Sequence, residues 1–318
     1  MPLKPFLIPQ GGPISSSILL VILGPTASGK TRVGVQIARA LGGEIISADS
    51  RQVYRGMDLG TGKDLKEYGD IPYHLIDIID PAQEFSLFEF QQRFREVFQD
   101  ILERGRIPIL VGGTGLYLDA VLRQYRLAKV PTDEVLRQKL APLPLSELVK
   151  RLQKVNPRLH NTTDLLDRER VIRAIEISEF KNESDFSGFL PEFQAAVFGI
   201  RWPREVLRRR ITERLRERLR QGMIGEVKKI IKSGISFNKL DFFGLEYRYV
   251  GMYLQGEINK NDMFQKLKAA IHQLAKRQET WFRRMERQGV RIQWVDGDRY
   301  PAETILGMLK NERSRVDF

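Results

Sequence analysis

The residues best suited to chemistry in this sequence form a glycine-rich loop that ends in a lysine and a threonine. In such a loop, backbone N–H groups point inward, the lysine adds a positive charge, and the final hydroxyl can bind Mg²⁺. The segment fits the P-loop pattern of Gly, four residues, Gly, Lys and Ser/Thr, and its members are Gly24, Pro25, Thr26, Ala27, Ser28, Gly29, Lys30 and Thr31. An apolar run precedes it and a helical pattern follows, which a plain glycine-rich turn would not require. The loop predicts phosphate binding without specifying the reaction.

A second chemical group follows the next predicted strand. Asp49 lies directly after the run Glu44–Ala48. Because the carboxyl ends of parallel strands meet at one edge of a sheet, this carboxylate is expected to face phosphates held by the P-loop. Spacing alone leaves three roles open for Asp49, namely a general base, a metal ligand and a helix N-cap.

The elements that must position these groups alternate between strand and helix. Helical periodicity follows the P-loop as far as Gly42-Gly43 and returns between Leu87 and Glu103. Runs of strand length are expected to form the sheet, at Ile18–Leu23, Glu44–Ala48, Tyr73–Ile79 and Ile107–Val111. This alternation predicts an α/β fold, a P-loop NTPase-like parallel sheet flanked by helices on both faces.

The pattern changes after Arg126. Prolines separate short helical pieces there, and a polar stretch runs to Gly188, so we interpret 127–190 as a small helical insertion domain ending in a loop. Residues 18–126 and 191–318 then form the core domain, to which Ala195–Ile200 returns as a strand. Residues 1–17 are expected to be a flexible tail.

The C-terminal part of the core is predicted to be helical. From Glu205 onward a stripe of residues one turn apart should be buried, formed by Leu207, Ile211, Leu215 and Leu219. A final helix is expected over 261–288. The tail after it is expected to be peripheral.

Composition limits the class of protein. The chain has 318 residues, no cysteine and three histidines. The lack of cysteine excludes disulfides, thiolate-bound zinc and a thiol nucleophile, and it agrees with a cytoplasmic location. No apolar run has the length of a membrane-spanning helix, and the N-terminal residues lack the apolar core of a secretory signal, so no membrane association is expected.

The positive charge is concentrated in two stretches. The net charge is +12, of which segment 201–220 contributes +6 and segment 276–291 contributes +4. Such clustering predicts a polyanionic partner that binds through its phosphates. The alternative for the first segment is local pairing along a helix, because glutamates lie three or four residues from its arginines at Glu205, Glu213 and Glu217.

Several motifs together resemble the tRNA dimethylallyltransferases, also called the IPP transferase family. In the family's order they are Gly24–Thr31, Asp49–Asp58, Gly60–Lys63, His74–Asp77, Gly112–Tyr117, Asp167–Ala174 and Ala275–Arg283. The resemblance implies transfer of a dimethylallyl group from dimethylallyl diphosphate to N6 of adenosine 37, beside the anticodon in the anticodon stem-loop of tRNA. Diphosphate is released, Mg²⁺ is the cofactor, and the family suggests a monomer.

The resemblance also implies residue roles. Lys30 and Thr26 are catalytic contacts to the diphosphate, Thr31 is the Mg²⁺ ligand, and Asp49 is the general base. The residues implied in tRNA binding, some of them in the insertion domain, are Asp49, Ser50, Arg51, Gln52, Thr114, Arg137, Glu169, Arg170, Val171, Ile172 and Arg173.

Two sets of residues have ordinary structural alternatives. The alternative for Arg170 and Arg173 is an ordinary solvated helix face. Trp281 and Phe282 can stack on a base, but packing against the core sheet is the favoured interpretation.

The sequence departs from the family's pattern at several positions on the substrate side. Ile271-His272 replaces the usual Thr-Arg, and Glu169 replaces a glutamine. Gly62 stands where alanine is common, and Gly244-Leu245-Glu246 stands where Gly-Tyr is usual. These changes bear on the tRNA contacts and leave the P-loop and Asp49 intact.

Three rival functions remain to be weighed. An adenylate isopentenyltransferase would prenylate a free nucleotide and would need neither an insertion domain nor basic stretches. A small-molecule kinase would need a Walker-B aspartate, for which Leu75-Ile76-Asp77 is the candidate. An RNA-binding module would not need an intact Lys30, Thr31 and Asp49.

Overall fold

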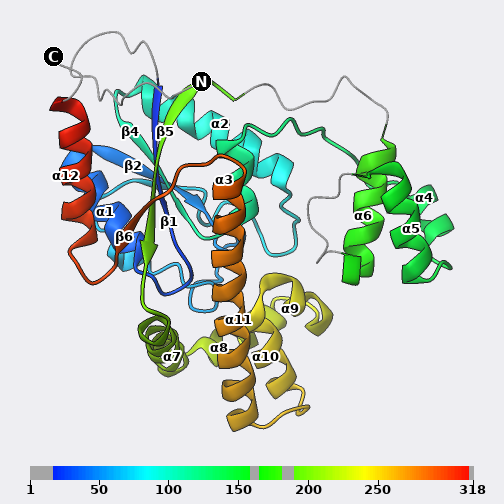
Figure 1. Ribbon diagram of the computed structural model, residues 1–318. Coiled ribbons are helices and arrows are strands. Elements are labelled where there is room, and N and C mark those ends of the chain that lie inside the picture. Colours follow the sequence, from blue (N-terminus) through cyan, green and yellow to red (C-terminus); the bar gives the residue numbers. More distant parts are fainter. Residues whose placement is uncertain (1–16, 158–164, 181–189, 315–318) are drawn as a thin grey trace. The chain divides into compact units, whose positions relative to one another are not determined.

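The core of the fold is a parallel sheet. The computed structural model describes residues 17–157, 165–180 and 190–314, and its strands lie in the order β3-β2-β4-β1-β5-β6 (Figure 1). They are β1 Ser17–Leu23, β2 Gly43–Ala48, β3 Tyr73–His74, β4 Ile107–Gly112, β5 Phe193–Arg201 and β6 Gln293–Asp296. Each neighbouring pair in this sheet is parallel. The predicted α/β class is confirmed.

The central strand β1 is buried on both faces of the sheet. Its alternate side chains enter two different apolar clusters, Ile18, Leu20 and Ile22 on one face and Leu19, Val21 and Leu23 on the other. Helices cover both faces (Figure 1). The first face packs against α1 Lys30–Leu41 and α12 Pro301–Ser314, and the second against α2 Leu87–Glu103, α3 Gly115–Leu122 and α11 Lys260–Arg287.

Local signals explain where two of these helices begin and end. Helix α2 starts at a capping box, in which the Ser86 hydroxyl accepts from the Glu89 N–H and the Glu89 carboxylate accepts from the Ser86 N–H. Helix α1 ends at Gly42, whose φ of 66° is a left-handed conformation that suits glycine. The sequence predicted both boundaries.

A third cluster lies among helices beyond the sheet. It joins α7 Arg204–Arg220 and α11 to three helices that the sequence analysis did not resolve, α8 Met223–Lys232, α9 Phe237–Phe243 and α10 Leu245–Leu254. The predicted stripe on α7 is confirmed at Leu207, Ile211 and Leu215. Leu219 is only half-buried, and Arg218 is the fourth buried residue.

Two predictions about strands were wrong. Strand β3 ends at His74 because Leu75 and Asp77 have φ of 63° and 55°, which breaks the extended backbone; the short 3₁₀ helix η1 Leu65–Glu67 precedes it. The tail after α11 is not peripheral. Strand β6 pairs with β5, and Ile305 and Leu309 of α12 are buried in the first cluster.

The chain divides into two compact units, residues 1–125 with 190–318, and residues 126–189. The second unit contains α4 Glu134–Leu140, α5 Leu145–Val155 and α6 Arg168–Glu179, packed around six buried residues, Leu140, Leu148, Leu152, Val171, Ile172 and Ile175. Its buried Glu176 carboxylate accepts from Arg137 at 2.7 and 3.1 Å and from Arg173 at 3.0 Å. A charge neutralised by two guanidinium groups therefore ties α4 to α6.

Some predictions fall on residues outside those described, namely the tail over 1–16 and the polar stretch that ends at Gly188. Within the described part of the chain, no helix combines the length and apolar character that crossing a membrane requires.

Replacing Glu176 by Gln should destabilise residues 126–189 by about 2 kcal/mol, because an amide cannot neutralise two guanidinium groups. Hydrogen exchange of the α6 amides measures the loss, and the exposed Glu147→Gln on α5 is the matched control. Unchanged protection of α6 in E176Q would contradict this role.

The same carboxylate predicts how this unit responds to acid. Burial alone would raise the pKa of Glu176, but hydrogen bonds from Arg137 and Arg173 outweigh burial and hold the pKa below its ordinary value. Its stabilisation should therefore be present at neutral pH and be lost as the pH falls through that lowered pKa. In E176Q, α6 protection should lose this acid dependence.

Candidate active site

Three loops begin at the same level on one edge of the sheet. In the strand register, Leu23 of β1 and Ala48 of β2 both lie opposite Gly112 of β4. The P-loop, the segment that begins with Asp49 and the loop that begins at Gly113 consequently leave the sheet side by side. The predicted meeting of Asp49 with the P-loop at the carboxyl edge is confirmed.

The P-loop has a tightly constrained backbone. The Ser28 N–H donates to the Pro25 carbonyl at 3.2 Å, and Ala27 and Gly29 have φ of 61° and 88°. There is no room for a side chain at Gly24, where a Cβ would lie 2.6 Å from the Ser28 Oγ. Consecutive turns of this kind direct N–H groups into a concave anion site.

Lys30 supplies the positive charge expected in this site. Burial lowers the pKa of Lys30 to about 8, the Asp49 carboxylate opposes that shift, and Arg214 and Arg218 add to it. The side chain of Lys30 is therefore within electrostatic reach of Asp49 and of two arginines from α7. A desolvated cation of this kind interacts strongly with a bound anion.

Asp49 is oriented by the turn that it begins. Its Oδ1 accepts from the Arg51 N–H at 2.9 Å, which engages one carboxylate oxygen and fixes the direction of the group. The residues that follow form a turn rather than a helix, so the N-cap role weighed for Asp49 is wrong. The positions of Asp49 and Lys30 suit a carboxylate that works on a substrate held by the P-loop.

Residues 50–52 and Thr114 connect this turn to its neighbours. The Thr114 Oγ1 accepts from the Ser50 N–H at 3.1 Å and joins β4 to the Asp49 segment. Gln52 is buried, and its amide spans the Ser47 hydroxyl and the Gly62 carbonyl at 3.2 Å each. Gln52 thus has a structural role that the sequence analysis did not foresee. The Arg51 guanidinium lies 4.9 Å from the ring centroid of the exposed Phe242.

Gln278 is a site residue that the sequence analysis quoted within a motif but did not single out. From α11, its Oε1 accepts from the Thr26 N–H at 2.8 Å, and its Nε2 donates to the Gly113 carbonyl at 2.9 Å. One amide side chain therefore links the P-loop to the loop after β4. No spacing signal in the sequence could have connected residues 252 positions apart.

Helix α7 directs some of its arginines at the site and not at its own glutamates. Arg210 donates to the Ala27 carbonyl at 2.8 Å and stacks on Trp202, whose Nε1 donates to the Ser28 carbonyl at 2.8 Å. Arg214 donates to the Gly62 carbonyl at 3.2 Å and pairs with Asp64. Local pairing within α7 is seen for Arg220 with Glu217, at 3.7 Å between exposed side chains.

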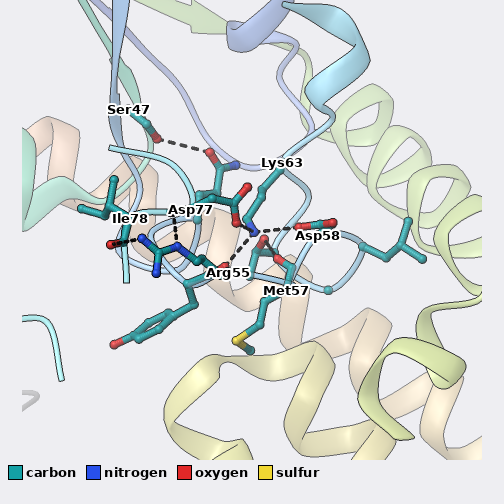
Figure 2. Close-up of polar contacts among 12 residues, drawn as sticks. Ser47, Arg55, Met57, Asp58, Lys63, Asp77 and Ile78 are labelled. Carbon is teal, nitrogen blue, oxygen red and sulfur yellow. Dashed lines mark hydrogen bonds and ion pairs between the residues drawn. The ribbon is translucent and has the colours of Figure 1, made fainter. Parts of the chain in front are cut away.

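The loop over 58–63 is held by a buried lysine. Lys63 donates to the Tyr54 carbonyl and to Asp58, each at 2.7 Å, and pairs with Asp77. Figure 2 shows the Lys63 side chain between the two carboxylates of Asp58 and Asp77. Asp77, the candidate Walker-B carboxylate, therefore neutralises a buried cation of its own chain. This finding weakens the kinase alternative.

A carboxylate from α8 holds the same loop from the other side. Glu226 accepts from three successive N–H groups, of Asp58, Leu59 and Gly60, at 2.7 to 2.9 Å, and from the Tyr247 hydroxyl at 2.7 Å. The sequence offered no signal for Glu226, because its partners are backbone groups about 166 residues away. The loop is consequently fixed relative to α8.

The remaining predicted tRNA contacts belong to the second unit. Arg137 and Arg173 are engaged by Glu176, and Arg173 also donates to the carbonyls of Val130 and Pro131. The side chains of Val171 and Ile172 are in the core of that unit, so the tRNA contacts predicted at these two positions would have to come from their backbone groups. Glu169 and Arg170 are exposed at the start of α6, where Arg170 lies 3.4 Å from Asp167.

The aromatic pair on α11 packs as the favoured interpretation expected. Phe282 is fully buried in the second cluster, and Trp281 covers Gly115, where a Cβ would lie 2.3 Å from the indole. His272, at a departure from the family's pattern, has its Nε2 3.4 Å from the Arg208 carbonyl of α7. Its neighbour Ile271 is buried in the third cluster.

The side-chain oxygens near the P-loop suit Mg²⁺ that is bound together with the substrate's phosphate groups. In the described residues, no three His, Asp or Glu side chains converge to hold a metal by themselves. Mg²⁺ is commonly held by one or two protein oxygens together with phosphate oxygens and water. The Thr31 hydroxyl at the start of α1 can serve as that protein oxygen.

Comparisons with known proteins agree with one another. The family model described as IPP transferase matches residues 52–285, and one described as isopentenyl transferase matches residues 17–68. The chain is 62% identical to "tRNA dimethylallyltransferase 2" of Syntrophotalea carbinolica, over 91% of this chain and 97% of that protein. It is 60% identical to "tRNA dimethylallyltransferase 1" of Geotalea uraniireducens, with 92% and 97% covered.

Solved structures give the same picture. The tRNA isopentenylpyrophosphate transferase of Bacillus halodurans aligns with a TM-score of 0.68 and 34% identity, over 95% of this chain and all of that one. A eukaryotic dimethylallyltransferase acting on tRNA aligns with a TM-score of 0.72 and 23% identity, over 93% and 79%, a likeness of fold alone. The predicted parallel sheet of P-loop type, flanked by helices, is thus shared with these structures.

Replacing Gln278 by Ala should weaken binding of inorganic diphosphate about tenfold, because two hydrogen bonds that position the P-loop are lost. Isothermal titration calorimetry in the presence of Mg²⁺ measures the affinity. The exposed Gln273→Ala on the same helix is the control and should bind as the wild type does. Equal affinities for Q278A and Q273A would show that the bridge does not shape the site.

Proposed function

Because this chain belongs to the IPP transferase family, we propose that it transfers a dimethylallyl group from dimethylallyl diphosphate to N6 of adenosine 37 in tRNA. The observation that carries the proposal is the oriented Asp49 carboxylate beside the P-loop and Lys30. A P-loop alone would suit many phosphorylated ligands. A carboxylate held next to it adds a base for the second substrate.

The P-loop side of the site stabilises the leaving group. Its N–H groups, Lys30 and the hydroxyls of Thr26 and Thr31 are the ligands we assign to the diphosphate and its Mg²⁺. When bound, Mg²⁺ neutralises charge on the diphosphate oxygens. The C–O bond to the allylic carbon then breaks with its electron pair on the diphosphate, so the fixed positive charges act where negative charge develops.

The Asp49 side of the site prepares the nucleophile. The lone pair of adenine N6 is delocalised into the ring, which makes N6 a weak nucleophile. As the bond from N6 to the allylic carbon forms, Asp49 takes the N6 proton, a contribution of about 10²–10⁴-fold. The hydrogen bond from the Arg51 N–H leaves Asp49 pointed in one direction before the base arrives.

The tRNA side of the proposal rests on charge and on exposed residues. The target base must leave the anticodon loop stack, which costs a few kcal/mol. Ser50, Arg51 and Thr114 line the edge of the sheet near Asp49, and Arg51 with the exposed Phe242 offers a guanidinium and a ring on which bases stack. Glu169 and Arg170 of the second unit are further candidates.

The remaining expectations follow from the same activity. We place the protein in the cytoplasm, where tRNA is modified, and we expect a monomer that binds the anticodon stem-loop. An adenylate isopentenyltransferase is the alternative that shares the same core chemistry. The acceptor substrate separates the two.

Incubation with labelled dimethylallyl diphosphate, Mg²⁺ and either bulk tRNA or AMP tests the activity. Label should enter tRNA and not AMP, because the basic stretches and the second unit suit a large polyanion. Label in AMP alone would contradict the proposal and show that the protein is an adenylate isopentenyltransferase. ATP hydrolysis without prenyl transfer would point to a kinase.

Asp49→Asn should lower turnover by about 10²–10⁴-fold and leave the affinities for both substrates close to those of the wild type. Asparagine keeps an oxygen for the Arg51 N–H but cannot accept the N6 proton. Single-turnover prenyl transfer measures the rate, and the exposed Asp298→Asn is the control. Near-normal turnover in D49N would rule out Asp49 as the base.

A further inference from the structure

Arg218 is a buried cation of α7 that the described residues satisfy only in part. Only 8% of the residue is exposed, yet its Nε and Nη2 have no hydrogen-bond partner among the described residues. Its Nη1 lies 3.7 Å from Glu246, which is close enough for an ion pair but too long for a good hydrogen bond. An unsatisfied buried guanidinium is costly, so its retention points to a group that arrives from outside the chain.

The surroundings of Arg218 indicate what that group is. Arg210, Arg214 and Arg218 follow one another at intervals of four on α7, and the first two already contact the P-loop and Gly62. Lys30 experiences repulsion from both Arg214 and Arg218. Burial and Arg214 lower the pKa of Arg218 to about 10, which leaves it charged at neutral pH. Arg210 thus contacts the P-loop while Arg214 and Arg218 lie against Gly62, and such a row of cations on one helix would be stabilised by an anion.

Gly62 makes the space that Arg218 occupies. A Cβ at this position would lie 1.5 Å from the Arg218 Nη2 and 2.9 Å from the Arg214 Nη2, and Gly62 has a φ of 66°. Gly62 and Glu246 are two of the positions at which the sequence departs from the family's pattern. In the structure both of these residues contact Arg218: Gly62 leaves room for its guanidinium group, and Glu246 forms an ion pair with it.

We propose that Arg218 is an additional ligand of the substrate's diphosphate, admitted beside the P-loop by Gly62 and held there by Glu246. The identity of the anion as the diphosphate of the prenyl donor rests on the proposed function. Nε and Nη2 are enclosed against Gly62 in the structure, so they must turn toward the P-loop to donate to diphosphate oxygens and add to the charge supplied by Lys30. We assign the site to the diphosphate and not to a tRNA phosphate because Arg210, on the same helix, contacts the P-loop through the Ala27 carbonyl.

Binding of inorganic diphosphate in the presence of Mg²⁺ tests the proposal by calorimetry. Arg218→Met, which keeps the length of the side chain and removes its charge, should raise the Kd about ten- to a hundredfold, because charge-assisted hydrogen bonds are lost. Arg218→Lys keeps a charge without the planar fork and should raise the Kd less. The exposed Arg209→Gln, on the same helix, should leave the Kd unchanged. Affinity of R218M equal to that of R209Q would overturn the proposal.

A second pair of variants separates ligand binding from folding. Gly62→Ala should weaken diphosphate binding as R218M does, since the new methyl group displaces the guanidinium. In the double variant G62A/R218M the Kd should match that of R218M alone, because both changes remove the same contact. Thermal unfolding is measured for each variant. If R218M and R218K lower the melting temperature equally and bind diphosphate as the wild type does, Arg218 is structural and the proposal fails.

The outcomes also distinguish this proposal from the proposed function. Affinity of R218M for tRNA, measured in the same buffer, should equal that of the wild type, and a selective loss of tRNA binding would overturn the assignment to diphosphate. If the wild type transfers no prenyl group but binds diphosphate through Arg218, the proposed function fails and the anion site stands. If it transfers the prenyl group and R218M has an unchanged KM for the donor, the site fails and the function stands.

Discussion

The site depends on a constraint set by the sheet, which is that three adjacent parallel strands end at one level. Leu23 of β1 and Ala48 of β2 both pair with Gly112 of β4, which lies between them. The loops that follow these three residues therefore leave the sheet together. Gly112 is required for this closeness, since a Cβ there would lie 2.3 Å from the Ala48 carbonyl. The placement of Asp49 at the same edge of the sheet as the P-loop depends on this alignment.

Helices from distant parts of the chain then fix the loops in place. Gln278 links two of them, Trp202 and Arg210 hold P-loop carbonyls, and Glu226 holds the loop over 58–63. These contacts are hydrogen bonds to backbone groups, which set loop conformation directly. An anion site made of N–H groups works only when its backbone is already in place before the substrate arrives, because reorganisation would offset part of the binding.

The distribution of charge gives the basic stretches two roles instead of one. Part of the excess on α7 faces inward, where Arg210 contacts the P-loop and Arg214 and Arg218 lie against Gly62, and part remains exposed toward solvent. The inward set concentrates positive potential in a buried region, where each charge is worth more than at the surface. The exposed arginines are suited to binding a long polyanion, whose phosphates can contact them at the surface. The same helix therefore serves both proposed substrates.

The features that depend on local spacing can be predicted from the sequence alone. The P-loop, the strands around it, the α2 and α1 boundaries and the position of Asp49 after β2 all follow from patterns within a few residues. The boundaries of the helical insertion were predicted at 127 and 190, and the structure divides the chain at 126 and 189. Strand β6 and helix α12 were missed because their apolar signal is short, and β3 was overextended because left-handed residues are not visible in hydropathy.

Which charged and polar side chains meet depends on how the elements pack together in space. Gln278 and Glu226 contact partners that are distant in the sequence, and Lys63 pairs with the carboxylate of another loop. Arg218 is buried, although its charge and its place in an arginine-rich helix are typical of a surface residue. The physical reason is that hydrogen bonds and ion pairs act over a few ångströms in space, whatever the separation along the chain. A sequence pattern records the period of a helix or strand, but it does not record which two faces are brought together.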